Sequence, residues 1–228
     1  MTAETALEED ELSPAERRRR KVRDAILEAA EAIFTEEGEA GISMRRIAER
    51  IDYSPAALYK YFNSKEALFD EIREQFFERL YGRMVAVAET VTEGPLVCEQ
   101  CLRAYVETGL EQPAHYRLAF SSWFESDFEE RQDSFGYAAS ERLDLMIEKG
   151  VADGWFAPCD TYLASMFVWS GAHGLTMLAV TIPDFPHGKE KCAHLTLDDV
   201  IAFHAEATAR GLATPKLHAW LDAKKAKK

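Results

Sequence analysis

Two signals for the start of a helix, at Ser43 and at Ser54, stand close together near the N-terminus and constrain the fold more than any other feature. A serine hydroxyl accepts a hydrogen bond from a backbone N–H of the first helical turn, which would otherwise lack a partner. Pro55 follows Ser54, and proline is favoured in the first helical position because the N–H that it lacks would be unpaired there. Leu58 and Phe62 are the inward positions of the second segment. Two short helices joined by about three residues form a helix-turn-helix by spacing alone, a spacing that helical hairpins without a role in DNA binding share.

Helical patterns flank this motif on both sides. Before it, apolar residues recur at three- and four-residue steps until Gly38 and Gly41 supply a turn. After it, Asn63 is expected to cap a fourth helix, with Glu66 three residues later in a capping-box arrangement. We call residues 17–63 the head. Its expected inward positions are Val22, Ile26, Ala29, Ala30, Ile33, Met44, Ile47, Ala48 and Ile51, and those of the fourth helix are Leu68, Phe69, Ile72, Phe76 and Leu80.

The charge of the chain is unevenly distributed. Its formal net charge of -13 would on its own argue against a nucleic-acid partner. However, residues 1–16 carry six acids and no base, whereas residues 17–65 carry eleven Lys and Arg against eight Asp and Glu. The basic segment is therefore the one that holds the helix-turn-helix, and phosphate would be bound there.

Five consecutive basic residues, 17–21, lead into the first apolar face. They fit a flexible arm that touches phosphate or the minor groove of DNA, and they equally fit charges that only solubilise the first helix. Residues 1–16, which are acidic and have no periodicity, predict a disordered tail.

The segment ISMRRIAERIDYSPAALYKYFNSKEALFDEI, residues 42–72, resembles the DNA-binding domain of the TetR family, and the likeness extends over about residues 17–80. The residues that carry it are Ile47, Ala48, Ser54, Leu58, Tyr59, Phe62, Lys65, Glu66 and Leu68. The chain departs from the family in the turn, where Asp52 replaces a common glycine. Because Asp tolerates the left-handed conformation better than most residues, we expect the turn to be retained. A shorter stretch, Trp-Ser-Gly-Ala-His-Gly at residues 169–174, is similar to the Trp-His-Gly class of TetR C-terminal domains.

The resemblance implies a DNA-binding surface on the helix-turn-helix. Tyr59 and Lys65 look like phosphate contacts, which position a protein without reading sequence. Arg45 matches a position that can reach N7 and O6 of a guanine. Solvated charges that touch nothing are the other interpretation of Arg45, Arg46 and Lys60. The expected DNA-binding residues are Ser43, Arg45, Arg46, Ser54, Pro55, Ala56, Ala57, Tyr59, Lys60, Tyr61 and Lys65.

Beyond residue 85 the pattern stays helical, with breaks near residues 94, 113, 150 and 183 and a last helix capped at Thr196. As a group, the aromatic side chains of this body exceed what a small helical domain needs, which predicts a pocket for an apolar or aromatic effector. The expected lining is Phe120, Trp123, Phe124, Phe128, Trp169 and His173. Each of these residues fits the core as well, and His173 fits either a hydrogen-bonded core residue or a polar contact to the effector.

Residues 161–182 contain no charged residue and are long enough to span a bilayer. The flanking residues are Asp160 and Asp184, whereas Lys or Arg would be typical beside a membrane span. A helix buried by its own domain on one side and by a dimer partner on the other explains the same apolarity. This favours a homodimer over a membrane-attached protein.

No catalytic or metal-binding arrangement stands out in the sequence. It contains no GxSxG, HExxH, Walker loop or dinucleotide fingerprint. Cys98 and Cys101 form a CxxC pair, to which His187, Cys192 and His194 could add ligands, but thiols without metal fit better. The acidic N-terminus lacks the order of a signal peptide. We therefore expect a cytoplasmic protein that is no enzyme and needs no metal or cofactor.

The expected fold is all-α. Residues 1–16 form the acidic tail, 17–63 a three-helix DNA-binding domain, 64–212 a helical domain for effector binding and dimerisation, and 213–228 a C-terminal segment with a basic tail. The family implies that helices at about 160–182 and 196–210 pair with a second copy. The two heads would then bind a near-palindromic, double-stranded operator, with recognition helices about 34 Å apart. A repressor released by a small-molecule effector is expected; an activator, a membrane-attached adaptor and a helical enzyme are the alternatives.

Overall fold

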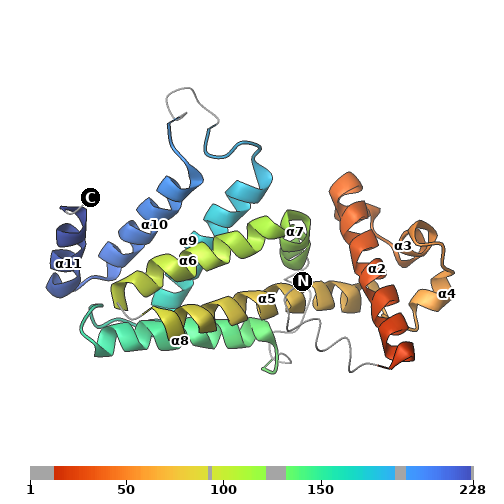
Figure 1. Ribbon diagram of the computed structural model, residues 1–228, viewed down its shortest axis with the longest axis horizontal. Helices are drawn as coiled ribbons and strands as arrows, with labels where there is room; N and C mark the ends of the chain where they lie inside the picture. Colours follow the sequence, from red (N-terminus) through yellow and green to blue (C-terminus); the bar gives the residue numbers. More distant parts are fainter. Residues whose placement is uncertain (1–12, 92–93, 122–131, 188–193, 227–228) are drawn as a thin grey trace. The chain divides into compact units, whose positions relative to one another are not determined.

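The computed structural model describes residues 13–91, 94–121, 132–187 and 194–226 (Figure 1). Within these residues the regular structure is helical, and strand geometry is limited to an isolated bridge between Phe156 and Ala213. The all-α prediction is thereby confirmed. The chain divides into two compact units, of which the first runs to Ile72 and includes Leu118, while the second begins at Arg73.

The first unit is built from one long helix, several short ones and the start of another around one core. It contains α2 (Pro14–Glu37), the 3-10 turn η1 (Glu39–Gly41), α3 (Met44–Arg50), α4 (Pro55–Leu58) and the first turns of α5 (Lys65–Thr90). The predicted inward positions meet in this core, where Ile26, Ile47, Leu58 and Leu68 are fully buried and Phe62 is 3% exposed. Val22 and Ile51 pack against its edge.

The turn between α3 and α4 forms as the sequence predicts, with Asp52 in the place of glycine. Asp52 has φ 57°, in the left-handed region. The N–H of Tyr53 donates to the carbonyl of Ala48 at 2.9 Å and closes the end of α3. This backbone arrangement is the usual way to satisfy the last carbonyls of a helix, and Asp is among the few non-glycine residues that accept it.

Serines cap the helices of the first unit, and three of them lie at or near the helix-turn-helix. Ser43 Oγ accepts from Arg46 N–H and Ser54 Oγ accepts from Ala57 N–H, so both predicted caps are confirmed. The prediction of Asn63 as the next cap is wrong, because Ser64 Oγ accepts from Ala67 N–H at 3.1 Å and α5 begins at Lys65. Asn and Ser are equally good caps, and two adjacent candidates cannot be ranked by type alone.

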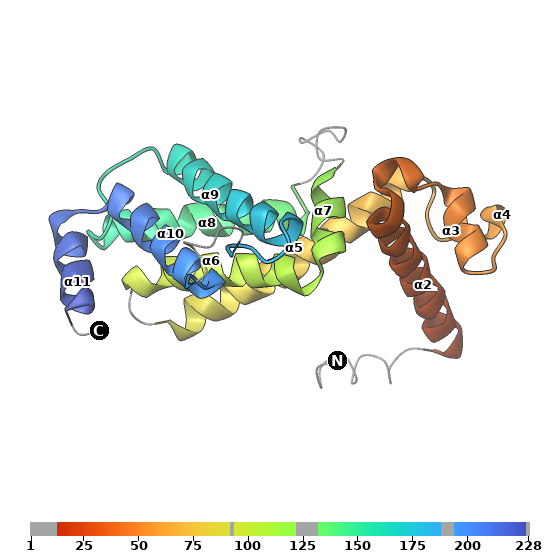
Figure 2. The ribbon, with the colours of Figure 1, turned by 90° about the horizontal axis from the view of Figure 1, so that it is seen from above.

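The second unit packs the remaining turns of α5 with the later helices. These are α6 (Gly94–Glu111), the start of α7 (Pro113–Ser121), α8 (Phe135–Ala152), α9 (Thr161–Thr181), α10 (Leu197–Leu212) and α11 (Pro215–Lys225). Helix α6 contacts α9 and α10, and α8 contacts α9 (Figure 2). The predicted cap at Thr196 is confirmed by its hydrogen bond from Asp199 N–H.

Close helix packing in this unit depends on a glycine. A Cβ on Gly109 of α6 would collide with the Thr176 methyl group of α9 and would lie 3.1 Å from the ring of Tyr116. Thr176 and Tyr116 are both fully buried. Gly109 therefore lets α6 and α9 approach closely around the buried aromatic side chains described below.

Candidate functional site

The outer face of the helix-turn-helix is a small exposed surface on α4 and the turn after it. Leu58 and Phe62 point into the core, while Ser54, Pro55, Ala56, Tyr59 and Lys60 are exposed. Tyr59 is 51% exposed, which is high for a tyrosine. The structure thus brings the predicted residues of α4 onto one surface, with hydroxyl, ammonium and methyl groups available to a partner.

Arg45 stands on α3 with its side chain 79% exposed. Its partner is Glu49, one turn later, at 2.9 Å. An exposed pair at this spacing is worth only about 0.3–0.5 kcal/mol. The guanidinium of Arg45 can therefore exchange Glu49 for another acceptor at small cost.

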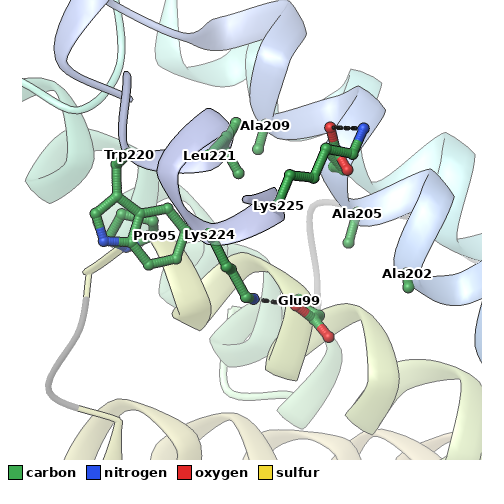
Figure 3. A pocket seen from close by; sticks show the side chains of 10 residues that line it. Pro95, Glu99, Ala202, Ala205, Ala209, Trp220, Leu221, Lys224 and Lys225 are labelled. Carbon is green, nitrogen blue, oxygen red and sulfur yellow. Dashed lines mark hydrogen bonds and ion pairs between the residues drawn. The ribbon is translucent and has the colours of Figure 1, made fainter. Parts of the chain in front are cut away.

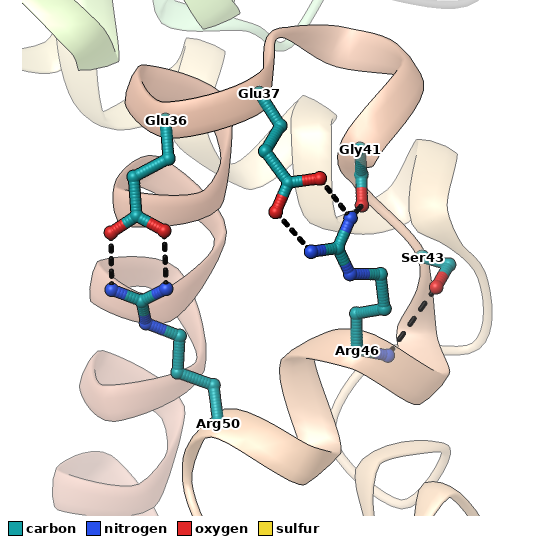
Figure 4. A network of polar contacts seen from close by, with 6 residues as sticks. All are labelled: Glu36, Glu37, Gly41, Ser43, Arg46 and Arg50. Carbon is teal, nitrogen blue, oxygen red and sulfur yellow. Dashed lines mark hydrogen bonds and ion pairs between the residues drawn. The ribbon is translucent and has the colours of Figure 1, made fainter.

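Arg46 and Arg50 serve a different purpose, because both connect α3 to α2 (Figure 4). Arg50 binds both carboxylate oxygens of Glu36, at 2.6 and 2.7 Å. Arg46 binds both oxygens of Glu37 and also donates to the carbonyl of Gly41. Hydrogen bonds from these arginines lower the pKa of both glutamates. Arg46, which the sequence places among the DNA-binding residues, thus has its guanidinium engaged within the head.

Arg23 of α2 holds the chain that follows α4. Its guanidinium donates to the carbonyl of Tyr61 at 3.3 Å, lies 4.5 Å from the ring centre of Phe62 and pairs with Glu71 at 2.7 Å. The Tyr61 side chain packs against the core of the head. Lys65 lies with its Nζ 5.2 Å from the ring centre of Phe69. Of these predicted DNA-binding residues, Tyr61 is turned inward and Lys65 lies at the start of α5.

Comparison with known proteins agrees with this geometry. The family model described as bacterial regulatory proteins, tetR family, matches residues 26–72, which contain α3, α4 and the turn between them. The chain is a TetR-family transcriptional regulator.

Curated relatives and solved structures extend the likeness of this TetR-family regulator. It is 27% identical to the uncharacterised HTH-type transcriptional regulator YobS of Bacillus subtilis, over 67% of this chain and 76% of YobS. It is 27% identical to the HTH-type transcriptional repressor KstR2 of Mycolicibacterium smegmatis, over 60% of this chain and 68% of KstR2. The crystal structure of the TetR-family regulator PfmR from Thermus thermophilus has the same fold, with a TM-score of 0.66 and 24% identity over 83% of this chain and 99% of PfmR.

The second unit of the regulator contains a chain of hydrogen bonds between aromatic side chains, of which Tyr105 and Tyr116 are buried and Trp169 and His173 are half-buried. Trp169 Nε1 donates to the hydroxyl of Tyr105 at 3.2 Å, and the hydroxyls of Tyr105 and Tyr116 lie 3.4 Å apart. The hydroxyl of Tyr116 lies 2.6 Å from His173 Nδ1. We call these four residues the Tyr-His cluster; they come from α6, α7 and α9.

Burial determines the protonation of the Tyr-His cluster. It raises the pKa of Tyr105 and of Tyr116 and lowers the pKa of His173. The phenols therefore keep their protons at neutral pH and the imidazole is uncharged. The hydroxyl of Tyr116 can donate to Nδ1 only in the neutral tautomer of His173 that carries its ring proton on Nε2.

The predicted effector-binding residues lie in different places in the structure. Trp169 and His173 both belong to the Tyr-His cluster. Phe120 is half-buried near the end of α7 and belongs to the first unit. Trp123, Phe124 and Phe128 lie outside the described residues. Sequence analysis missed the roles of Tyr105 and Tyr116, although a tyrosine at an inward helical position is a signal, since its hydroxyl needs a partner when buried.

A surface pocket of about 80 Å³ lies elsewhere in the second unit, between α6, α10 and α11 (Figure 3). Pro95, Ala205 and Trp220 line it, and two ion pairs stand at its rim: Lys224 with Glu99 at 3.1 Å and Lys225 with Glu206 at 2.9 Å. Pockets for effector-sized molecules measure roughly 300–1,000 Å³. This pocket is too small for such a molecule.

The cysteines of the CxxC pair have the properties of packed thiols. Burial raises the pKa of Cys98 to about 11 and that of Cys101 to about 12. Metals bind the thiolate, which these pKa values disfavour at neutral pH. Among the described residues, which exclude Cys192, no three His, Cys, Asp or Glu side chains come together as a metal site would require.

Replacing Arg46 by Gln is expected to lower the Tm of the protein, because both carboxylate oxygens of Glu37 and the carbonyl of Gly41 lose their donor. Arg45→Gln is the matched control, since it removes one exposed pair on the same helix. Thermal unfolding followed by circular dichroism measures both. Equal Tm values for the two variants would contradict the role assigned to Arg46.

Stability is expected to depend on pH through His173. Its pKa is lower in the folded protein than the ordinary 6.5, so the unfolded chain binds the proton more readily. Stability is therefore fully present above pH 6.5 and falls as the pH drops below it. In urea titrations between pH 7.5 and 5, His173→Gln should show a smaller loss of unfolding free energy than wild type, and the exposed His218→Gln serves as control. An unchanged slope in His173→Gln would refute this assignment.

Proposed function

We propose that this regulator is an effector-responsive repressor that binds a near-palindromic operator as a homodimer. The observation that carries the proposal is the exposed α4 surface, presented by a head whose caps, turn and core are complete. Arg45 would read a guanine edge, Tyr59, Lys60 and Lys65 would bind phosphates, and the apolar start of α4 would contact thymine methyl groups. Arg46 would position α3 through Glu37 instead of touching DNA.

An exposed apolar stripe on α9 supports the homodimer. Leu163, Phe167 and Leu178 are 65%, 54% and 46% exposed, and Ser170 and Gly174 lie exposed between them. These positions follow one another at steps of three and four residues, so they share one helix face. The small residues in its middle allow a second helix to approach closely.

A second stripe on α10 continues the first. Phe203 is 77% exposed, and Ala207 and Gly211 follow at four-residue steps. A Cβ on Gly211 would lie 4.0 Å from Phe167 Cε1, so the two stripes adjoin. His204 packs over Gly171 and closes the seam between α9 and α10. Together the stripes form one apolar face, suited to a four-helix bundle with a second copy of this chain.

A membrane span is the competing explanation for α9. Within the described residues, Thr161–Thr181 has the length and composition of a spanning helix, and 28% of its most apolar window is buried. The partial burial means that one side of α9 already belongs to the protein's own packing. A dimer partner covers the remaining side, whereas lipid would have to accept the helices packed around it as well.

We place the effector contact at the Tyr-His cluster. The cluster offers a few hydrogen-bonding groups among aromatic side chains. Ligand pockets use such groups to orient a mostly apolar molecule. The polar group of an apolar or aromatic molecule would form a hydrogen bond with one member of the cluster and so replace a hydrogen bond between two of its members. The cytoplasm is the compartment in which such a regulator would meet both DNA and effector.

Helix α5 provides a path from the effector to the DNA. The ring of Phe76 on α5 lies 5.2 Å from that of Tyr116 and 6.0 Å from that of Tyr105, edge to face in both cases. The same helix begins at Lys65. An effector that moves the two tyrosines would therefore shift the helix that carries a phosphate contact, with a coupling of about 1–3 kcal/mol being typical.

Binding to DNA tests the proposed function directly. Genomic fragments selected by the purified protein should share a near-palindrome, and titration with a labelled duplex should show tight binding that weakens with salt. Arg45→Ala should lose about 1–3 kcal/mol and relax the preference for one base, and Tyr59→Ala should weaken binding to all sequences. Tyr137→Ala, at an exposed position of α8, is the control. Selection that returns no shared sequence would exclude the proposal.

Dimerisation is tested at two leucines of similar exposure. Leu163→Arg places a charge within the α9 stripe and should convert a dimer into a monomer in analytical ultracentrifugation without detergent. Leu145→Arg, at a position 56% exposed on α8, should leave the dimer intact. A wild-type protein that stays in solution only with detergent would favour the membrane explanation, and a dimer unaffected by Leu163→Arg would place the interface elsewhere.

A further inference from the structure

The first two turns of α2 carry a row of basic side chains outside the segment that matches the family. The basic run occupies residues 17–21, whereas the family match begins at residue 26. In the structure the run is part of a helix, because Ser13 caps α2 in a capping box with Glu16. The side chains are thus held on a helical scaffold, which the flexible-arm interpretation did not foresee.

The arginines of the head divide into two groups by their partners. Arg23, Arg45, Arg46 and Arg50 each pair with a glutamate. By contrast, the described part of the chain offers no carboxylate partner to Arg19, Arg20 or Lys21. A chain with a net charge of -13 has many acids available, so this unpaired positive charge stands out.

Helix geometry divides the run further, into two faces. At 100° per residue, Arg19 and Arg20 lie within about 60° of Arg23 around the helix axis, whereas Arg18 and Lys21 lie about 140–160° away. Arg23 is the residue that holds the carbonyl of Tyr61 and the ring of Phe62, directly after the recognition helix. Arg19 and Arg20 therefore lie, one turn earlier, on the same side of α2 as Arg23, the side that faces Tyr61 and Phe62 after α4.

We propose that Arg19 and Arg20 form a second DNA contact, which binds backbone phosphates beside the half-site read by α4. The proposal rests on the proposed function for its partner. Guanidinium groups bind phosphate through two parallel hydrogen bonds, and a fixed helix orders them before binding. The contact adds affinity and lengthens the bound stretch of DNA, and it carries no base preference of its own.

The test compares two double variants within the same run. Arg19→Gln/Arg20→Gln and Arg18→Gln/Lys21→Gln each remove two positive charges, and Gln keeps the helix propensity of Arg and Lys. DNA affinity is measured against salt on the selected operator and on a random duplex of equal length. Each lost phosphate contact lowers the salt slope by about 0.9, so the first variant should lose up to about 3.6 in a dimer. The ratio of operator to random affinity should stay unchanged.

Two results would overturn the proposal. The first is a salt slope that falls equally in both double variants, because the run would then act only as diffuse charge. The second is a wild-type slope retained in Arg19→Gln/Arg20→Gln. Because phosphates are present on any duplex, the salt slope on the random duplex tests the phosphate contact even if no operator is found. Failure to find an operator would count against the proposed function alone. Far-ultraviolet circular dichroism confirms that both variants fold.

Discussion

A recognition helix of four residues cannot be stable by itself, and the architecture of the head follows from that constraint. Isolated helices shorter than about 12–15 residues are marginal in water, and α4 spans only Pro55–Leu58. Its form comes from outside: Ser54 pairs an N–H of the first turn, and Leu58 and Phe62 are buried among the other helices. Arg23 then fixes the chain after it. The exposed residues of α4 can be selected for DNA because the buried ones already determine its position.

The second unit is subject to a related constraint, because its exposed apolar surface is stabilised when it is covered. Helix α9 has no charged residue, yet its own unit buries only one side of it. The two adjoining stripes on α9 and α10 leave side chains such as Phe203 largely in water, which costs free energy in proportion to the apolar area. In the proposed homodimer a second copy would remove this cost by presenting the same face, and it would also set the distance between two heads. Burial and operator geometry would then be one requirement.

Sequence alone predicted most of the fold, but it did not predict which side chains pair with one another at the candidate sites. Helical periodicity and caps located the elements, and the tolerance of Asp for left-handed backbone anticipated Asp52. Adjacent cap candidates were confused at Asn63 and Ser64, since propensity does not separate them. The pairing of Arg46 with Glu37 and the contact of Tyr116 with His173 each join residues of two different helices, so the pattern of a single helix does not encode them. Such contacts appear only when helices pack.

The charges of the head show why contacts between packed helices matter for function. Counting charge over residues 17–65 gives a small positive excess and says nothing of where it acts. Arg23, Arg46 and Arg50 are neutralised by glutamates, and two of those pairs bind α3 to α2, whereas the exposed pair of Arg45 with Glu49 is easily exchanged. The positive charge left for a polyanion then lies at the start of α2, at Arg45 and around α4 and α5. In the proposed complex, phosphate would meet these remaining basic residues, because acids of the head pair with the arginines that join its helices.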